Sequence, residues 1–141
     1  MVVLATVDPF GWPHPALISY AELLALDPAR LRLALHAGSR STRHLRDSAR
    51  ATLVFADPFL TLYVKVEATA LPELPRAIAP GATPPEIEVA RFELHVRDVL
   101  EDRAEGEEAG ARLTGGITVE WPGGLEAAVR RHVRLRDVLT R

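Results

Sequence analysis

The strongest constraint on the fold is a strict alternation of apolar and polar residues over positions 60–70. Leu60, Leu62, Val64, Val66, Ala68 and Ala70 alternate with Thr61, Tyr63, Lys65, Glu67 and Thr69. Successive side chains of a β-strand point to opposite faces, so this spacing predicts a strand with one buried face. The alternation recurs over residues 31–36 and 90–97, which we also expect to be strands.

Shorter apolar runs complete the set of expected elements. Residues 2–7 and 15–20 flank a turn rich in Pro and Gly and predict a hairpin. Residues 51–56 are apolar on both faces, which indicates a central strand. For residues 21–26 the sequence allows two structures, an extension of the preceding strand or a helical turn. The other expectations are helices over 39–47 and 125–140, a phase slip at 98–99 typical of a bulge, loops over 71–85 and 102–110, and a short strand over 116–121.

The helix expected over 125–140 carries basic residues and an apolar stripe. The stripe consists of Leu125, Ala128, Val129, Val133 and Leu139, and the helix is expected either to cover the barrel or to build the dimer.

These elements predict a mainly β protein with few helices. Two helices are too few for a doubly wound α/β sheet, and closure into a barrel removes exposed strand edges. With 141 residues and 48% hydrophobic content, the chain is expected to form a single domain over residues 1–141.

Composition narrows the classes of function. The net charge of −2 provides no broad positive field for nucleic acid, and no apolar run is long enough to cross a membrane. The N-terminus lacks the features of a signal peptide, and cysteine is absent, so we expect a cytoplasmic protein without disulfides or thiolate chemistry. A single Lys against sixteen Arg, with no Asn or Gln, is typical of a thermophile, although codon bias gives the same pattern.

The segment following the strand at 31–36 carries the clearest chemical signal. The strand leads to Gly38, and hydroxyl and guanidinium groups then gather at the predicted helix start, in Ser39, Arg40, Ser41, Thr42 and Arg43. Free amides at a helix N-terminus carry partial positive charge and favour an anion, and arginine adds charge-assisted hydrogen bonds to phosphate. The residues alone fit two interpretations equally: a phosphate site, or a well-capped surface helix with solvated arginines.

The order of these segments resembles the FMN-binding split barrels of the pyridoxamine 5'-phosphate oxidase-like family. The similarity rests on residues 38–45 followed by 50–55, and on the hairpin formed by 3–7 and 13–20. It covers about residues 2 to 71. The resemblance implies a six-stranded antiparallel split barrel, an FMN cofactor, a homodimer with flavin at the subunit interface, and a small-molecule substrate or electron donor.

The resemblance also implies roles for individual residues. Ser39, Arg40, Ser41, Thr42 and Arg43 would hold the FMN phosphate. Backbone groups of Ala16, Leu17, Ile18 and Ser19 would lie along the isoalloxazine ring. Ala34 and Leu35 would line the inner site, and Thr61 would supply a polar contact to the flavin. No catalytic side chain is implied.

The chain departs from the oxidase itself at two places. Ser41 stands where the oxidase has a second basic residue, so Arg43 is expected to supply that charge. The C-terminal run 129–136 lacks the oxidase's substrate-binding signature. The expected function is therefore that of an FMN-dependent oxidoreductase acting on an unidentified small molecule. Relatives of this barrel also use a deazaflavin or haem in place of FMN.

Other functions remain as alternatives. The flavin protein could be a non-catalytic carrier or sensor, and a small nucleic-acid-binding barrel is a further possibility that scarce aromatic residues disfavour. The five histidines show no metal-ligand spacing. The basic run 130–136 is interpreted as a solvated or dimer-facing helix.

Overall fold

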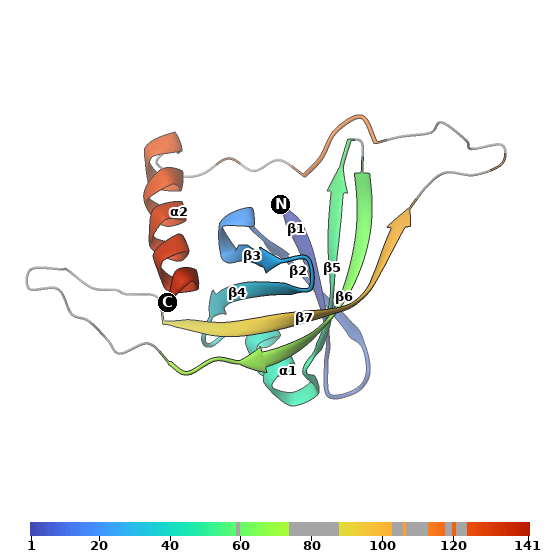
Figure 1. Cartoon of the computed structure of the whole chain (residues 1–141), viewed down its shortest axis with the longest axis horizontal. Coiled ribbons are helices and arrows are strands. Elements are labelled where there is room, and N and C mark those ends of the chain that lie inside the picture. Colours follow the sequence, from blue (N-terminus) through green and yellow to red (C-terminus); the bar gives the residue numbers. More distant parts are fainter. Residues whose placement is uncertain (59, 74–87, 103–105, 107–112, 118–119, 121–123) are drawn as a thin grey trace, which may run out of the picture.

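The computed structural model contains one curved sheet of seven antiparallel strands (Figure 1). It describes residues 1–58, 60–73, 88–102, 106, 113–117, 120 and 124–141. In spatial order the strands are β2 (Pro13–Ile18), β1 (Val2–Val7), β5 (Arg50–Asp57), β6 (Leu60–Ala70), β7 (Val89–Asp102), β4 (Arg30–His36) and β3 (Leu23–Asp27). β2 and β3 are the edges, and no ladder joins them within the described residues, so the barrel is split.

The core fills the concave side of the sheet. Inward-facing Leu4 pairs in register with Leu53, which in turn pairs with Val64, and all three are buried. Phe92 and Leu33 continue this layer on the other half of the sheet. Burial of these apolar side chains is the main stabilising contribution to such a fold.

β7 connects the two halves of the barrel. Its first half pairs with β4 on one side and β6 on the other, whereas its second half pairs with β6 alone. The register shifts at Lys65 and Val66, so that Arg97 is an extra residue in β7. Such a bulge bends a strand, which accounts for the phase slip expected at 98–99.

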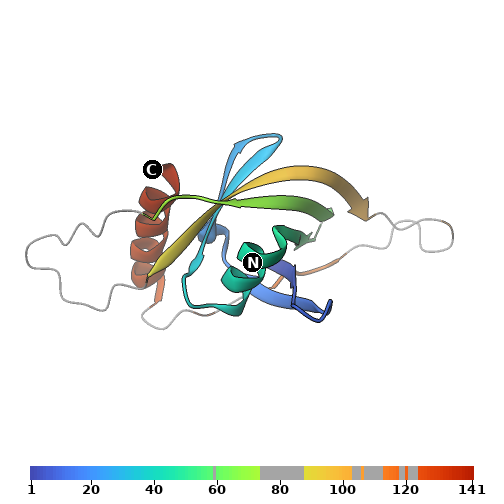
Figure 2. The same ribbon diagram turned by 90° about the horizontal axis from the view of Figure 1, so that it is seen from below.

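Two helices close the open sides of the sheet. The helix α1 (Arg40–Ser48) lies across one end of the barrel, where it contacts β1, β6 and β4 (Figure 2). The helix α2 (Gly124–Thr140) stands beside β3 and β4 and contacts the short 3-10 helix η1 (Tyr20–Glu22) (Figure 1).

The end of α2 is held by two arginines. Arg32 donates a hydrogen bond of 2.8 Å to the carbonyl of Leu139, and Arg91 donates one of 3.4 Å to the carbonyl of Val138. Cations complement the negative end of a helix, so the pair fixes α2 to the sheet.

The mainly β antiparallel class is confirmed, with seven strands in place of the six expected. The additional strand is β3, formed by residues that the sequence left open between strand and helical turn. The central position of β5 and the positions of both helices are confirmed. Residues 116, 117 and 120 lie outside any strand, and the rest of the strand expected over 116–121 lies outside the described residues, as do most of the loops expected over 71–85 and 102–110.

The apolar stripe expected on α2 is only partly buried. Leu139 is buried, but Leu125, Val129 and Val133 are exposed, because the helix turns Leu135 toward the sheet instead. Arg32 and Arg91 bind the helix by its last carbonyls, which sets this orientation.

Candidate functional site

The turn between β4 and α1 is built by hydrogen bonds among hydroxyl groups. Ser39 is the N-cap of α1, and its Oγ accepts a hydrogen bond of 3.1 Å from the amide of Thr42. The Thr42 hydroxyl donates to the carbonyl of His36 at 2.8 Å, and the Ser39 hydroxyl donates to Thr42 Oγ1 at 3.0 Å. Two of the five residues expected at the phosphate site therefore shape the turn.

The other donors of this turn are free to bind a ligand. Within the part of the chain that the structure describes, the amides of Arg40 and Ser41 have no acceptor, as expected in a first helical turn. The Ser41 hydroxyl also has no partner among these residues, although the residue is 95% buried with a relative exposure of 5%. Two amides and one hydroxyl thus lie together at the positive end of the helix dipole.

Two guanidinium groups flank these donors. Arg40 is exposed and forms no ion pair with any described residue. Arg43 donates one hydrogen bond of 3.2 Å to the carbonyl of Gly38, which leaves most of its five N–H donors free. The donor set at the start of α1 fits a phosphate group.

His36 adds order to the same turn. Its Nδ1 accepts a hydrogen bond of 3.1 Å from the amide of Gly38. A Cβ added at Gly38 would lie 3.3 Å from the His36 ring, so a side chain there would crowd the imidazole.

The four residues expected along the ring lie at one edge of the sheet. Leu17 is 57% exposed on the convex face, Ile18 is buried in the core, and Ala16 is half-buried. Ser19 follows β2 and is held by Glu22, whose Oε2 accepts from the Ser19 amide at 2.7 Å and from its hydroxyl at 2.9 Å. β2 pairs only with β1 among the described strands, so its outer edge offers free backbone groups.

Both residues expected on the inner wall are buried in this chain. Leu35 belongs to the main core. Ala34 has a relative exposure of 1% and lies beneath α2, against Leu135 and Leu139. Only backbone groups of this strand are therefore available to a ligand at these two positions.

Thr61 is not brought to α1 within one chain. It lies at the start of β6, on the convex face, seven residues before Ala68. The amide of Ala68 bonds to the carbonyl of Ala49 at the end of α1. Seven strand residues span about 23 Å, so Thr61 lies at the opposite end of the sheet.

A buried polar contact that the sequence analysis missed connects α1 with the β1–β2 hairpin. Thr6 Oγ1 lies 3.1 Å from Nδ1 of His44, and the His44 ring meets the His14 ring edge-on at a centroid distance of 5.0 Å. Thr6 continues the inward series of Val2 and Leu4, and His44 precedes the inward anchor Leu45. This alternation is the sequence signal from which an inward-facing Thr6 could have been predicted. The contact places β2 against α1.

Metal-ligand clusters and membrane-spanning helices were sought among the described residues. Among them, no three His, Cys, Asp or Glu side chains gather as metal ligands. None of the helices in these residues is both long and apolar enough to span a bilayer.

The comparisons with known proteins agree with this fold. A family model described as pyridoxamine 5'-phosphate oxidase matches residues 1–79. YclD, an uncharacterized protein of Bacillus subtilis strain 168, is 31% identical over 136 residues, which cover 96% of this chain and 80% of YclD.

Two solved structures share the fold at low sequence identity. A protein from Lactobacillus delbrueckii, whose proposed identity is a pyridoxamine 5'-phosphate oxidase, is 22% identical with a TM-score of 0.53, covering 70% of this chain and 82% of that one. A pyridoxamine 5'-phosphate oxidase-related, FMN-binding protein from Nostoc punctiforme is 15% identical with a TM-score of 0.54, covering 71% and 73%.

Fold and comparisons together define a split β-barrel of the pyridoxamine 5'-phosphate oxidase type. The chain belongs to the pyridoxamine 5'-phosphate oxidase family.

Proposed function

We propose that this protein binds FMN through the start of α1 and acts as an FMN-dependent oxidoreductase on a small molecule. The observation that carries the proposal is a set of donors in the β4–α1 turn that have no acceptor among the described residues: the amides of Arg40 and Ser41, the Ser41 hydroxyl, and the guanidinium of Arg40. An FMN phosphate is a dianion that can accept from all of them.

The residues of the turn have two different roles in holding the cofactor. Arg40, Ser41 and Arg43 bind the phosphate, while Ser39 and Thr42 keep the turn in shape through their mutual hydrogen bonds. Backbone groups on the free edge of β2, over residues 16–18, are suited to the polar rim of a flavin ring, whereas the amide and carbonyl of Ser19 already bond to Glu22. When bound, the flavin supplies the hydride or electron transfer, and the protein orients it.

A second copy of the chain is part of the proposal. Five residues on neighbouring strands are paired in register and form one apolar row on the convex face. They are Leu17, Val3, Val54, Tyr63 and Leu100. Leu17 and Leu100 are each 57% exposed. A contiguous apolar row of this kind is suited to a protein–protein contact, and the proposed assembly is a homodimer.

A titration of purified protein with FMN, followed by flavin fluorescence, tests cofactor binding. We expect saturable binding that the Arg40→Ala/Arg43→Ala double variant weakens at least about 100-fold, because each charged hydrogen bond contributes about 1.5–3 kcal/mol. Arg46→Ala removes an exposed arginine from a later turn of α1 and should bind like the wild type. Protein that ignores FMN would overturn the proposal.

Catalysis needs a separate measurement. The FMN-loaded protein is mixed with reduced nicotinamide, and its oxidation is followed by absorbance. Turnover above the rate of free FMN supports an enzyme, whereas tight FMN binding without turnover of any electron donor favours a flavin carrier or sensor.

A further inference from the structure

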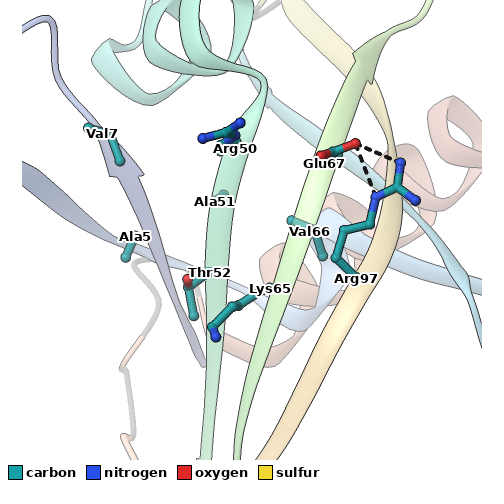
Figure 3. Close-up of a pocket in the computed structure, with 9 residues that line it drawn as sticks. All are labelled: Ala5, Val7, Arg50, Ala51, Thr52, Lys65, Val66, Glu67 and Arg97. Carbon is teal, nitrogen blue, oxygen red and sulfur yellow. Dashed lines mark hydrogen bonds and ion pairs between the residues drawn. The ribbon is translucent and has the colours of Figure 1, made fainter. Parts of the chain in front are cut away.

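A shallow hollow lies on the convex face beside the apolar row, because its lining residues Ala5, Thr52 and Lys65 are each two strand positions from a residue of that row. Figure 3 shows the residues that line the hollow. Its volume is about 310 Å³, at the low end of the range for small-molecule sites. Ala5 and Val7 on β1 and Thr52 on β5 provide small and apolar walls, and the charged lining comes from Arg50, Lys65, Glu67 and Arg97. The hollow is thus an apolar surface surrounded mainly by cations.

Of the three cationic side chains that line the hollow, two form ion pairs and one has no carboxylate partner among the described residues. Glu67 Oε2 accepts from Arg97 at 2.6 Å and 3.0 Å, and both bonds are visible in Figure 3. Lys65 pairs with Asp98 at 2.8 Å. The guanidinium of Arg50 pairs with no carboxylate among the described residues.

The β7 bulge explains why Arg50 is left unpaired. Arg50 and Glu67 are direct cross-strand partners, a position from which they would ordinarily interact. Arg97 is the extra residue of the bulge, and its side chain reaches Glu67 with two donors. The bulge therefore takes the natural partner of Arg50 and leaves a positive charge at the edge of an apolar depression.

We propose that this hollow binds a small organic carboxylate with a compact apolar body. The carboxylate would accept two parallel hydrogen bonds from Arg50, a geometry in which arginine excels. The apolar body would lie on Ala5, Val7 and the Thr52 methyl group, and the volume suits a single ring. The site is separate from the proposed phosphate site, because Arg50 follows the C-terminal end of α1 whereas the phosphate donors lie at its start.

The test is an NMR titration of uniformly ¹⁵N-labelled protein with benzoate, and with neutral benzamide as the matched control. We expect saturable shifts confined to amides around Ala5, Thr52 and Lys65, with benzamide at least about tenfold weaker, since it lacks the charge that strengthens the hydrogen bonds. Arg50→Ala should weaken benzoate binding at least about tenfold, and Arg50→Lys by less, since it keeps the charge but loses the fork.

Arg46→Ala is the control for loss of a nearby surface arginine and should leave benzoate binding unchanged. Thermal melts establish that each variant is folded. We expect all of them to fold, because Arg46 and Arg50 are both exposed. Absence of saturable shifts, shifts confined to the start of α1, equal binding of benzamide, or unchanged binding in Arg50→Ala would each overturn the proposal. The outcome does not depend on FMN, so it is independent of the cofactor proposal.

Discussion

The hydroxyl oxygen of Thr6 lies 3.1 Å from Nδ1 of His44, and both side chains are buried where α1 meets the β1–β2 hairpin. The same hydroxyl lies 3.4 Å from the carbonyl of His14. Thr6→Val keeps the shape of the side chain but leaves the imidazole nitrogen without its partner, which costs about 1–3 kcal/mol. Urea unfolding should show this loss, whereas Thr6→Ser should retain more of the stability. Equal stability of the valine variant and the wild type would contradict the assigned contact.

The two arginines that hold α2 give a second prediction. Arg91 has a relative exposure of 8%, and burial together with the neighbouring Arg32 lowers the pKa of its guanidinium. Besides the Val138 carbonyl, Arg91 binds the carbonyl of Pro72 at 2.7 Å. Replacing both Arg32 and Arg91 by Met should free the end of α2, seen as faster amide hydrogen exchange over residues 124–141. The exchange of β5 should remain slow.

The control for this pair is Arg97→Met, which removes an exposed arginine from the same strand as Arg91. It should leave exchange in α2 unchanged. If the double variant exchanges like the wild type throughout α2, the arginines do not anchor the helix.

Both tyrosines of the chain are predicted to ionise at a higher pH than an ordinary tyrosine side chain. Burial, followed by the hydrogen bond to Asp57, raises the pKa of Tyr20 above 10.0, and the hydrogen bond to Asp102 raises the pKa of Tyr63. The folded state thus favours the neutral phenol. The stabilisation of the fold by the protonated tyrosines is complete below pH 10. It is lost as the pH rises through the folded-state pKa.

An alkaline titration of the flavin-free protein, followed by phenolate absorbance, checks this behaviour. Neither tyrosine should ionise at the ordinary value. Asp57→Asn should lower the pKa of Tyr20 alone, and Asp102→Asn that of Tyr63 alone. A tyrosine that ionises near or below pH 10 in the wild type would count against the corresponding hydrogen bond.

The apolar row across the convex face predicts how the chain assembles. Leu17→Asp places a charge at one end of the proposed contact, and burying it unpaired is costly. Sedimentation velocity should show a dimer for the wild type and a monomer for the variant. Leu125→Asp, on the exposed side of α2, is the matched control and should remain dimeric. A monomeric wild type would exclude the homodimer.

Much of the fold was accessible from local pattern. The alternation over 60–70 gave β6 with its observed bounds, because one face of the strand is buried along most of its length. The start of α1 was visible to within two residues, since Ser39 and Ser41 are both strong N-cap types after a strand that ends near a glycine, and the structure has the cap at Ser39. β3 was not predicted, because its short segment is half-exposed and has no clear period.

The site was harder to derive, because its parts depend on contacts between distant segments. No sequence pattern distinguishes Thr42, whose hydroxyl shapes the turn, from Ser41, whose hydroxyl has no partner among the described residues. The burial of Ala34 depends on α2, about a hundred residues further along the chain. Arg50 has no carboxylate partner among the described residues because a bulge in β7 directs Arg97 to Glu67. Tertiary contacts decide such details.

The central claim is that the start of α1 binds a phosphate group, and a comparison of FMN with riboflavin tests it most directly. Riboflavin has the same ring but no phosphate, so the ratio of the two dissociation constants isolates the contribution of this turn. We expect FMN to bind at least about 100-fold more tightly, as two or more charged hydrogen bonds imply, and Arg40→Ala to reduce the ratio at least about tenfold. Equal affinities for the two flavins, or a ratio unchanged in Arg40→Ala, would contradict the claim.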